Sequence, residues 1–356
     1  MPHRIAVVGA GYFAAFHHDG WSRVPGAALL AICDQDPAKA SAAATRHGAR
    51  AFTDLATMLA ETAPDLLDIA IPPAGHAAAI RAGLAAGVGT IVCQKPFCRD
   101  LAEAEAVVAE AEAAGARLVV HENFRFQPWF RETARQLAAG ALGAPVSLAF
   151  RLRPGDGGGP DAYLARQPYF RAMPRFLLRE TGIHFVDVFR FLLGEVEAVF
   201  ADLRRLNPAI AGEDCATVLF RMACGARAQF DGNRLADHIA QDRRRTMGEM
   251  LLEGSEAALR LDGDGRLFLR RYGADAETPV PFAAAAEGFA GDSVRALQQH
   301  VVAHLDGTGP IENTARAYLA NLRVEAAIYR AADSGCWQRP EPRPAAHDPS
   351  PRQGPP

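Results

Sequence analysis

The sequence has 356 residues, more than a single domain of ordinary size requires, and it therefore predicts about two domains. Its 38 basic and 41 acidic residues leave a net charge of −3, which argues against a nucleic-acid-binding surface with a basic excess. The longest apolar runs, such as 26–33, are far shorter than the roughly 20 residues of a membrane-spanning helix. No secretory signal pattern precedes the first predicted strand, so we expect a cytoplasmic protein without membrane or nucleic-acid partners.

The first 122 residues alternate short apolar runs with longer amphipathic ones. Strands are predicted at 4–9, 28–34, 51–52, 66–71, 90–94 and 117–121. Helices are predicted between them at 14–24, 37–47, 54–61, 76–86 and 101–114. Alternation of this kind predicts a parallel sheet with helices on both faces, which is a Rossmann-type α/β domain over 1–122.

The pattern changes after residue 123. A helix at 128–139 and a strand at 145–153 precede a loop rich in glycine and proline at 154–174. A helix at 181–193 is followed by strand-like runs at 196–206, 215–222, 227–232, 249–253, 258–262 and 266–272, and then by helices at 293–306 and 313–333. We expect an α+β domain with a large, open, mostly antiparallel sheet over 123–335. The proline-rich stretch 336–356 has little to bury and is predicted to be a disordered tail.

Gly9, Gly11 and Ala14 fit the pattern G-x-G-x-x-A between the first predicted strand and the first helix. In a dinucleotide-binding turn, the first glycine permits the tight turn and the second lets the backbone approach the pyrophosphate. The pyrophosphate then lies at the helix N-terminus. Alone the motif is weak, because glycine pairs are common at strand–helix turns, and a purely structural βαβ unit is the alternative.

Asp34 strengthens the cofactor interpretation because it ends the second predicted strand, 23 residues after Gly11. A carboxylate there accepts hydrogen bonds from the adenosine ribose hydroxyls and repels a 2′-phosphate. Gln35 and Asp36 follow, so no adjacent arginine could attract that phosphate. The sequence therefore predicts NAD rather than NADP, while the alternative is that Asp34 only caps the next helix.

Lys95 stands out because only two of the 38 basic residues are lysines, the other being Lys39. Where arginine has replaced lysine almost everywhere, a retained lysine suggests a role that needs a compact ammonium group. The tripeptide Gln94-Lys95-Pro96 ends a strand of the parallel sheet, and ligands of such sheets bind at the carboxyl ends of the strands. The alternative is an ordinary surface lysine.

Glu180 and His184 are four residues apart on a predicted helix and so share one face. A carboxylate at that spacing could hold the imidazole and raise its basicity, and histidine is the usual base for a hydroxyl proton near neutral pH. The alternative is a solvated Glu–His pair. His300 and His304 have metal-binding spacing, but no third ligand accompanies them, so we expect no metal site.

Together these motifs resemble the glucose-fructose oxidoreductase/inositol dehydrogenase (Gfo/Idh/MocA) family. The family hallmarks are the glycine turn, a Glu-Lys-Pro motif and a D-x-G-x-H-x-x-D segment, which correspond to 9–14, 94–96 and 180–187 here, and N-x-R-F-x-P corresponds to 123–128. Gln94 replaces the usual glutamate, and Glu180 replaces the usual aspartate. Three longer segments, at 121–129, 151–157 and 230–234, look like those of the D-apiose dehydrogenase branch.

The resemblance implies an NAD-dependent sugar or polyol dehydrogenase acting on CH–OH in carbohydrate metabolism, with D-apiose oxidised to its lactone as the best candidate reaction. It implies that His184 is the general base, that Glu180 orients His184, and that Lys95 stabilises the reacting oxygen. It also implies a homodimer or homotetramer built through the second domain, which binds the substrate. Alternatives on the same fold are an NAD-using, redox-assisted glycosidase and a non-enzymatic NAD-binding regulator.

The expected ligand-binding residues follow from the motifs and from polar residues near the predicted cleft. Expected cofactor contacts come from Gly9, Gly11, Tyr12, Phe13, Asp34, Gln35, Ile71, His76, Gln94, Lys95 and Asn123. Expected substrate contacts come from Lys95, Arg125, Arg153, Tyr163, His184 and Asn233. Asp156, Arg166, Arg234 and His238 are weaker candidates, because a sugar pocket needs several donors and acceptors but any one such residue could simply be solvated.

Overall fold

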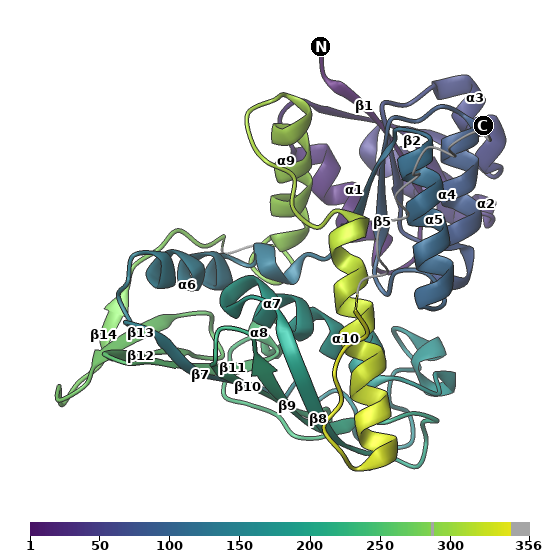
Figure 1. Cartoon of the computed structure of the whole chain (residues 1–356). Coiled ribbons are helices and arrows are strands. Elements are labelled where there is room, and N and C mark those ends of the chain that lie inside the picture. Colours follow the sequence, from purple (N-terminus) through teal and green to yellow (C-terminus); the bar gives the residue numbers. More distant parts are fainter. Residues whose placement is uncertain (286–287, 343–356) are drawn as a thin grey trace, which may run out of the picture.

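The computed structural model describes residues 1–285 and 288–342. Within these residues the chain forms two β-sheets, each covered by helices, with the chain crossing between them near residue 123 (Figure 1). None of the described helices combines the length and the apolar character needed to span a membrane. The expected combination of a Rossmann domain with an open-sheet α+β domain is confirmed.

The first sheet has six parallel strands in the order β3-β2-β1-β4-β5-β6, which is the Rossmann order. Its strands are β1 His3–Val8, β2 Ala27–Cys33, β3 Arg50–Phe52, β4 Leu66–Ile69, β5 Thr90–Gln94 and β6 Arg117–His121. The helices between them are α1 Ala14–Arg23, α2 Pro37–His47, α3 Leu55–Thr62, α4 His76–Ala85 and α5 Leu101–Ala113. Because β1 and β4 are neighbours, the strand order reverses there and opens a crevice at their carboxyl ends.

The second sheet has eight strands in the order β14-β13-β12-β11-β7-β10-β9-β8. Its strands are β7 Pro145–Leu152, β8 Val196–Arg204, β9 Cys215–Met222, β10 Arg227–Asn233, β11 Gly248–Gly254, β12 Ala257–Leu261, β13 Leu267–Arg271 and β14 Thr278–Val280. Only the β7–β10 pair among these is parallel. Strand β9 alternates buried and exposed residues, which is the pattern of a sheet with one covered face.

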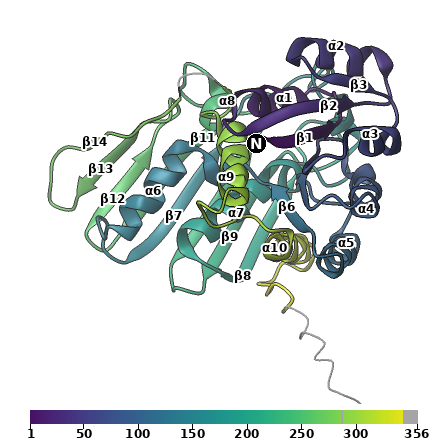
Figure 2. The ribbon, with the colours of Figure 1, turned by 90° about the horizontal axis from the view of Figure 1, so that it is seen from above.

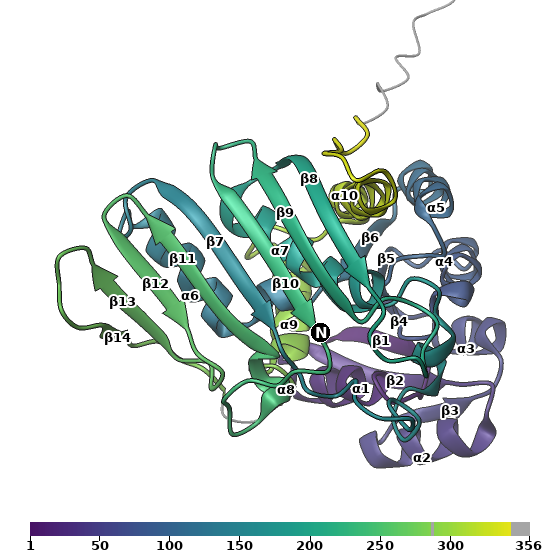
Figure 3. The same cartoon turned by 90° about the horizontal axis from the view of Figure 1, so that it is seen from below.

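Helices cover one face of this second sheet and leave the other bare. The covering helices are α6 Pro128–Ala138, α7 Ile183–Leu193 and α10 Ala315–Ser334, and the short helix α8 Arg243–Thr246 directly precedes the central strand β11. Seen from below, the strands lie in front of these helices, and no helix or strand of the described residues lies over them (Figure 3). The core on the covered side is rich in phenylalanine, including Phe150, Phe185 and Phe230.

Helix α9 (Ser293–Leu305) belongs in space to the first domain, although the sequence places it late in the second. It packs beside α1 (Figures 1 and 2). Leu297 and Val301 share a buried cluster with Ile5 and Trp21. The assignment of this helix to the second domain therefore needs a correction, since amphipathic periodicity identifies an apolar helix face but not the core that it joins.

The predicted disordered tail also needs a correction at its start. Gln338 exchanges two backbone hydrogen bonds of 2.8 Å with Val199 of β8. The ring of Trp337 lies against Phe200 at 6.0 Å and under the guanidinium of Arg221 at 4.3 Å. Pairing with edge strand β8 and the packing of Trp337 thus hold the start of this stretch against the second sheet. The rest of the prediction, 343–356, lies outside the described residues.

Candidate active site

The glycine turn between β1 and α1 has the shape that a dinucleotide needs. Gly9 has φ +112°, and a Cβ atom there would lie 2.3 Å from the carbonyl oxygen of Ala70. A Cβ on Gly11 would meet nothing within 4 Å, so its backbone borders open space. Helix α1 has no side-chain cap, unlike α2, α3 and α5, which begin at capping aspartates. Free backbone N–H groups at this terminus suit a pyrophosphate.

Asp34 follows β2 and lies directly beside the glycine turn. Its Oδ2 accepts a hydrogen bond of 2.7 Å from the backbone N–H of Ala10, and its Oδ1 accepts one of 2.9 Å from Asp36. Each carboxylate oxygen can accept more than one bond, so acceptor capacity remains for ribose hydroxyls. The fit of the turn and of this carboxylate agrees with a bound NAD, whose chemistry is to accept a hydride.

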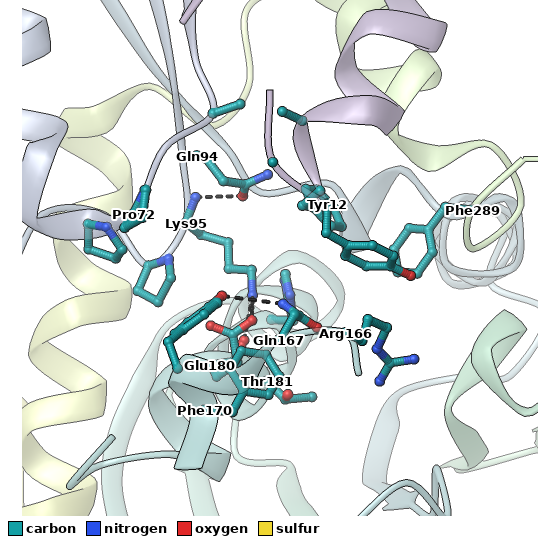
Figure 4. Close-up of a pocket in the computed structure, with 18 of the residues that line it drawn as sticks. Tyr12, Pro72, Gln94, Lys95, Arg166, Gln167, Phe170, Glu180, Thr181 and Phe289 are labelled. Carbon is teal, nitrogen blue, oxygen red and sulfur yellow. Dashed lines mark hydrogen bonds and ion pairs between the residues drawn. The ribbon is translucent and has the colours of Figure 1, made fainter. Parts of the chain in front are cut away.

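A cavity of about 440 Å³ extends from the glycine turn to the second domain. Figure 4 shows Lys95, Glu180 and Thr181 on one side and Tyr12 and Phe289 on the other. Among the expected cofactor residues, Gly11, Tyr12, Phe13, Ile71, Gln94 and Lys95 line it. From the second domain the lining includes Phe124, Asp156, Arg166, Glu180, Thr181, His184 and Arg234. The two domains therefore meet at one cavity, as a hydride-transfer site requires.

Lys95 projects from the carboxyl end of β5 across the cavity. Its Nζ donates to the Oε1 of Glu180 at 2.8 Å and to the main-chain oxygen of Glu180 at 2.6 Å (Figure 4). The two side chains are only 8% and 11% exposed, so the ion pair is poorly screened. Since an ammonium has three donors, one N–H of Lys95 remains for a ligand oxygen.

The expected Glu180–His184 pairing is wrong in this structure. The carboxylate of Glu180 binds Lys95, whereas the Nδ1 of His184 lies 2.5 Å from the Oε1 of Glu122. Spacing along one helix cannot reveal partners that lie on other elements, and here the partner of Glu180 is Lys95, which directly follows β5. Sequence reasoning missed Glu122, although a glutamate directly after a buried apolar strand was an available signal.

His184 is held as a neutral imidazole. Its ring stacks on Phe124 with 3.7 Å between centroids and 3° between planes. Burial, and after it the positive charge of Lys95, lowers the pKa of His184 well below its ordinary value. A neutral imidazole that borders the cavity can accept a proton.

Gln94, the departure from the family glutamate, has a specific set of partners. Its Oε1 accepts the backbone N–H of Lys95 at 2.6 Å, and its Nε2 lies 2.8 Å from the Nε2 of His17. The Nδ1 of His17 lies 2.7 Å from the Oδ2 of Asp68. An amide can donate to His17 and accept from Lys95 at once, which an ionised glutamate cannot do.

Two comparisons of sequence place the chain among known proteins. Residues 3–122 match the model of the oxidoreductase family with an NAD-binding Rossmann fold, and residues 130–250 match the GFO/IDH/MocA C-terminal domain. The chain belongs to the GFO/IDH/MocA oxidoreductase family. A D-apiose dehydrogenase of Paraburkholderia graminis is 35% identical over 93% of this chain and 88% of its own length. One of Rhizobium rhizogenes is 32% identical over 93% and 95% of the two chains.

Solved structures have the same architecture as this chain. An oxidoreductase from Agrobacterium radiobacter, crystallised with NAD⁺, L-tartaric acid and magnesium, is 30% identical and covers 95% of this chain and 98% of its own, with a TM-score of 0.86. An inositol dehydrogenase homologue from Azotobacter vinelandii, at 19% identity and a TM-score of 0.80, shows the shared fold over 95% and 98% of the two chains. The expectation of a Gfo/Idh/MocA enzyme that uses NAD is confirmed.

Several residues expected to contact the cofactor lie away from the cavity of this family enzyme. The Nε2 of buried His76 is 2.8 Å from the main-chain oxygen of Ile71, so His76 holds the loop after β4. The amide of Asn123 donates to Ser293 at 2.7 Å and ties the two domains together. Gly9, Asp34 and Gln35 are adjacent to the turn but outside the cavity lining. His76 and Asn123 therefore hold neighbouring segments of the site in place, and their contacts with the cofactor stay predictions.

Four expected substrate residues are also outside the cavity lining. Arg125 forms a bidentate pair with Asp187 at 2.6 and 2.7 Å, and Arg153 pairs with Asp231 at 2.5 Å. Tyr163 is buried in a small aromatic cluster.

Asn233 is the fourth of these residues, and its Oδ1 accepts backbone N–H groups of residues 235 and 236. Long polar side chains in the sequence look available for a sugar, but carboxylates from other segments engage the two arginines, and Asn233 is engaged by its own loop.

Three of the four weaker candidates line the cavity, while His238 lies outside the lining, with its Nδ1 2.7 Å from the main-chain oxygen of Arg153. Asp156 accepts hydrogen bonds from Arg234 at 2.6 Å and from Arg166 at 3.0 Å, and all three line the cavity. A second nitrogen of Arg234 donates to Thr181 at 2.9 Å. This network lies beside Lys95 and Glu180, and it gives the second domain fixed donors and acceptors for hydroxyl groups.

Proposed function

We propose that this protein oxidises a hydroxyl of a sugar by hydride transfer to NAD, and that the sugar is D-apiose, which becomes its lactone. The observation that carries the proposal is the meeting of Lys95 and His184 in one cavity that also reaches the glycine turn. Neutral His184 takes the hydroxyl proton, and Lys95 donates to the same oxygen as negative charge develops on it. Glu180 holds Lys95 in place.

The choice of D-apiose rests on two D-apiose dehydrogenases at 35% and 32% identity and on the three segments that resemble that branch. All three segments bring residues to the site. Segment 121–129 supplies Glu122 and Phe124, segment 151–157 supplies Asp156, and segment 230–234 supplies Arg234. Each of the three segments thus contributes residues to the region where substrate would bind.

The first test is the initial rate of NADH formation with D-apiose, beside aldopentoses, hexoses, inositols and hydroxy acids including L-tartrate. Each substrate is run with NAD and with NADP. The expected result is the highest kcat/KM with D-apiose and NAD. Faster turnover of another compound would keep the hydride-transfer mechanism and overturn the choice of sugar. Bound NAD without net NADH from any compound would favour the redox-assisted glycosidase or the regulator.

We also propose that copies of this chain associate as a homodimer or homotetramer through the bare face of the second sheet. Leu219 and Leu251 are exposed there by 36% and 41%, on strands β9 and β11. Light scattering after size exclusion is expected to give twice or four times the mass of one chain. The Leu219→Glu/Leu251→Glu variant is expected to give single chains, and a wild-type monomer would overturn the proposal.

A further inference from the structure

Glu122 lies fully buried directly behind His184. It follows β6 at the carboxyl edge of the Rossmann sheet. Its Oε1 faces His184 Nδ1 at 2.5 Å and accepts the backbone N–H of Phe124 at 3.2 Å, while its Oε2 accepts the hydroxyl of Tyr318 at 3.2 Å. Both oxygens thus face donors, which is the environment that an ionised carboxylate requires.

The orientation of the His184 ring is fixed by the same short segment. Glu122 engages Nδ1, and Phe124, two residues later, stacks on the ring face. No residue in 1–285 or 288–342 forms a hydrogen bond with the Nε2 of His184. A neutral imidazole carries one N–H, so a proton held on Nδ1 leaves the Nε2 lone pair available.

Several charged groups surround this pair. Lys95 and Arg125 favour the ionised form of Glu122, whereas burial raises the pKa of Glu122 to about 7. Glu180 and Asp187 favour a charged His184, whereas burial and Lys95 lower its pKa. Glu122 and His184 are in direct contact, so protons bind to them as a coupled pair.

We propose that Glu122 is a positioning residue of the dehydrogenase, whose carboxylate keeps the proton of His184 on Nδ1 and stabilises the imidazolium formed during oxidation. In that step the O–H bond of the substrate breaks and its proton goes to Nε2, while the hydride of the same carbon passes to bound NAD, the oxidant. The inference rests on the proposed function, because that function makes His184 the base.

The test compares pH profiles of kcat/KM for three variants. Glu122→Gln keeps the size of the side chain and an acceptor for Nδ1 but removes the charge. Its kcat is expected to fall on the order of 10- to 100-fold, the range for losing a charge-assisted hydrogen bond. The pH at which kcat/KM falls to half on the acidic side is expected to move lower, because the imidazolium loses its counter-ion.

Tyr318→Phe is expected to shift that half-point the opposite way, to higher pH, because the Glu122 carboxylate loses a donor. The matched control is Glu213→Gln. Glu213 is also buried and accepts two backbone N–H groups and the hydroxyl of Tyr329, but it does not contact His184. For Glu213→Gln, the pH at which kcat/KM falls to half on the acidic side is expected to equal that of the wild type. Equal shifts in the Glu122 and Glu213 variants, or none in either, would overturn the inference.

A measurement without substrate separates this inference from the proposed function. Histidine labelled with ¹⁵N reports which ring nitrogen carries hydrogen, and the His184→Asn variant assigns the signals. At pH 8 the Nδ1–H form is expected in the wild type. An Nε2–H form would overturn the role of Glu122 even if D-apiose is oxidised, while Nδ1–H without turnover of any sugar would leave the geometry correct and the proposed function wrong.

Discussion

Replacing Lys95 by methionine tests the site most severely, because methionine keeps an unbranched apolar chain and removes the ammonium with its three donors. Two of those donors bind Glu180, and the third is free for the substrate oxygen. Loss of one donor to a developing oxyanion typically lowers kcat by about 10²–10³, or about 2.7–4 kcal/mol. We expect a decrease of this size with the dissociation constant of NAD nearly unchanged.

The same substitution has a cost in stability that can be separated from catalysis. Removing one partner of a fully buried ion pair costs about 3–5 kcal/mol. Glu180 borders the cavity and is 11% exposed, so water can reach it and the cost is expected at or below about 3 kcal/mol. Glu180→Gln in the same chain removes the unpaired charge, and the double variant is expected to recover most of the stability but none of the turnover.

The assay combines initial rates of NADH formation, NAD titration by protein fluorescence and urea unfolding for the wild type, Lys95→Met and the double variant. Turnover of Lys95→Met within about threefold of the wild type would refute the electrostatic role, because the expected loss is at least about 100-fold. Equal instability of the single and double variants would refute the assignment of that cost to an unpaired Glu180.

Three further results are expected. In Asp34→Ala, the ratio of kcat/KM with NAD to kcat/KM with NADP should fall by about tenfold, or about 1.4 kcal/mol, because no carboxylate repels a 2′-phosphate. Gln94→Glu should lower the free energy of unfolding by about 1–3 kcal/mol, because buried His17 loses the amide donor and an ionised carboxylate cannot replace it. Burial lowers the pKa values of His18 and His76 to about 4, below the unfolded value of 6.5. Because the unfolded chain therefore binds protons more readily, urea unfolding should show that stability falls as the pH drops from about 6.5 to 4, by up to about 3 kcal/mol for each group.

Each of these three expectations would be contradicted by one result. An unchanged cofactor ratio in Asp34→Ala would remove Asp34 as the selector. Unchanged stability of Gln94→Glu would show that the amide donor to His17 does not contribute to folding. Stability that stays constant between pH 6.5 and 4 would mean that the two histidines are not protonated more readily in the unfolded chain than in the folded one.

The sequence was most informative where a local pattern determines local geometry. The glycine turn, Asp34 and Lys95 each follow a strand of the first sheet, and the carboxyl ends of parallel strands meet at one edge, so their convergence could be predicted. His184 joins them from α7 of the other domain. The family resemblance implied this meeting, but the spacing of residues alone could not predict it.

Several of the failures concern partners that lie far apart along the chain. Glu180 binds Lys95, 85 residues away, and Arg125 binds Asp187, 62 residues away. Helix α9 has an apolar face that fits either domain, and only the packed structure shows that it covers α1. Pairing across domains depends on tertiary packing, which residue spacing does not encode.

The most direct measurement of the central claim is the stoichiometry of NADH to D-apionolactone formed from D-apiose, for the wild type, Lys95→Met and His184→Asn. The expected result is one NADH for each lactone in the wild type, with turnover lost in both variants while both still bind NAD. Conversion of a sugar without net NADH, or full activity in either variant, would contradict hydride transfer at the Lys95–His184 site.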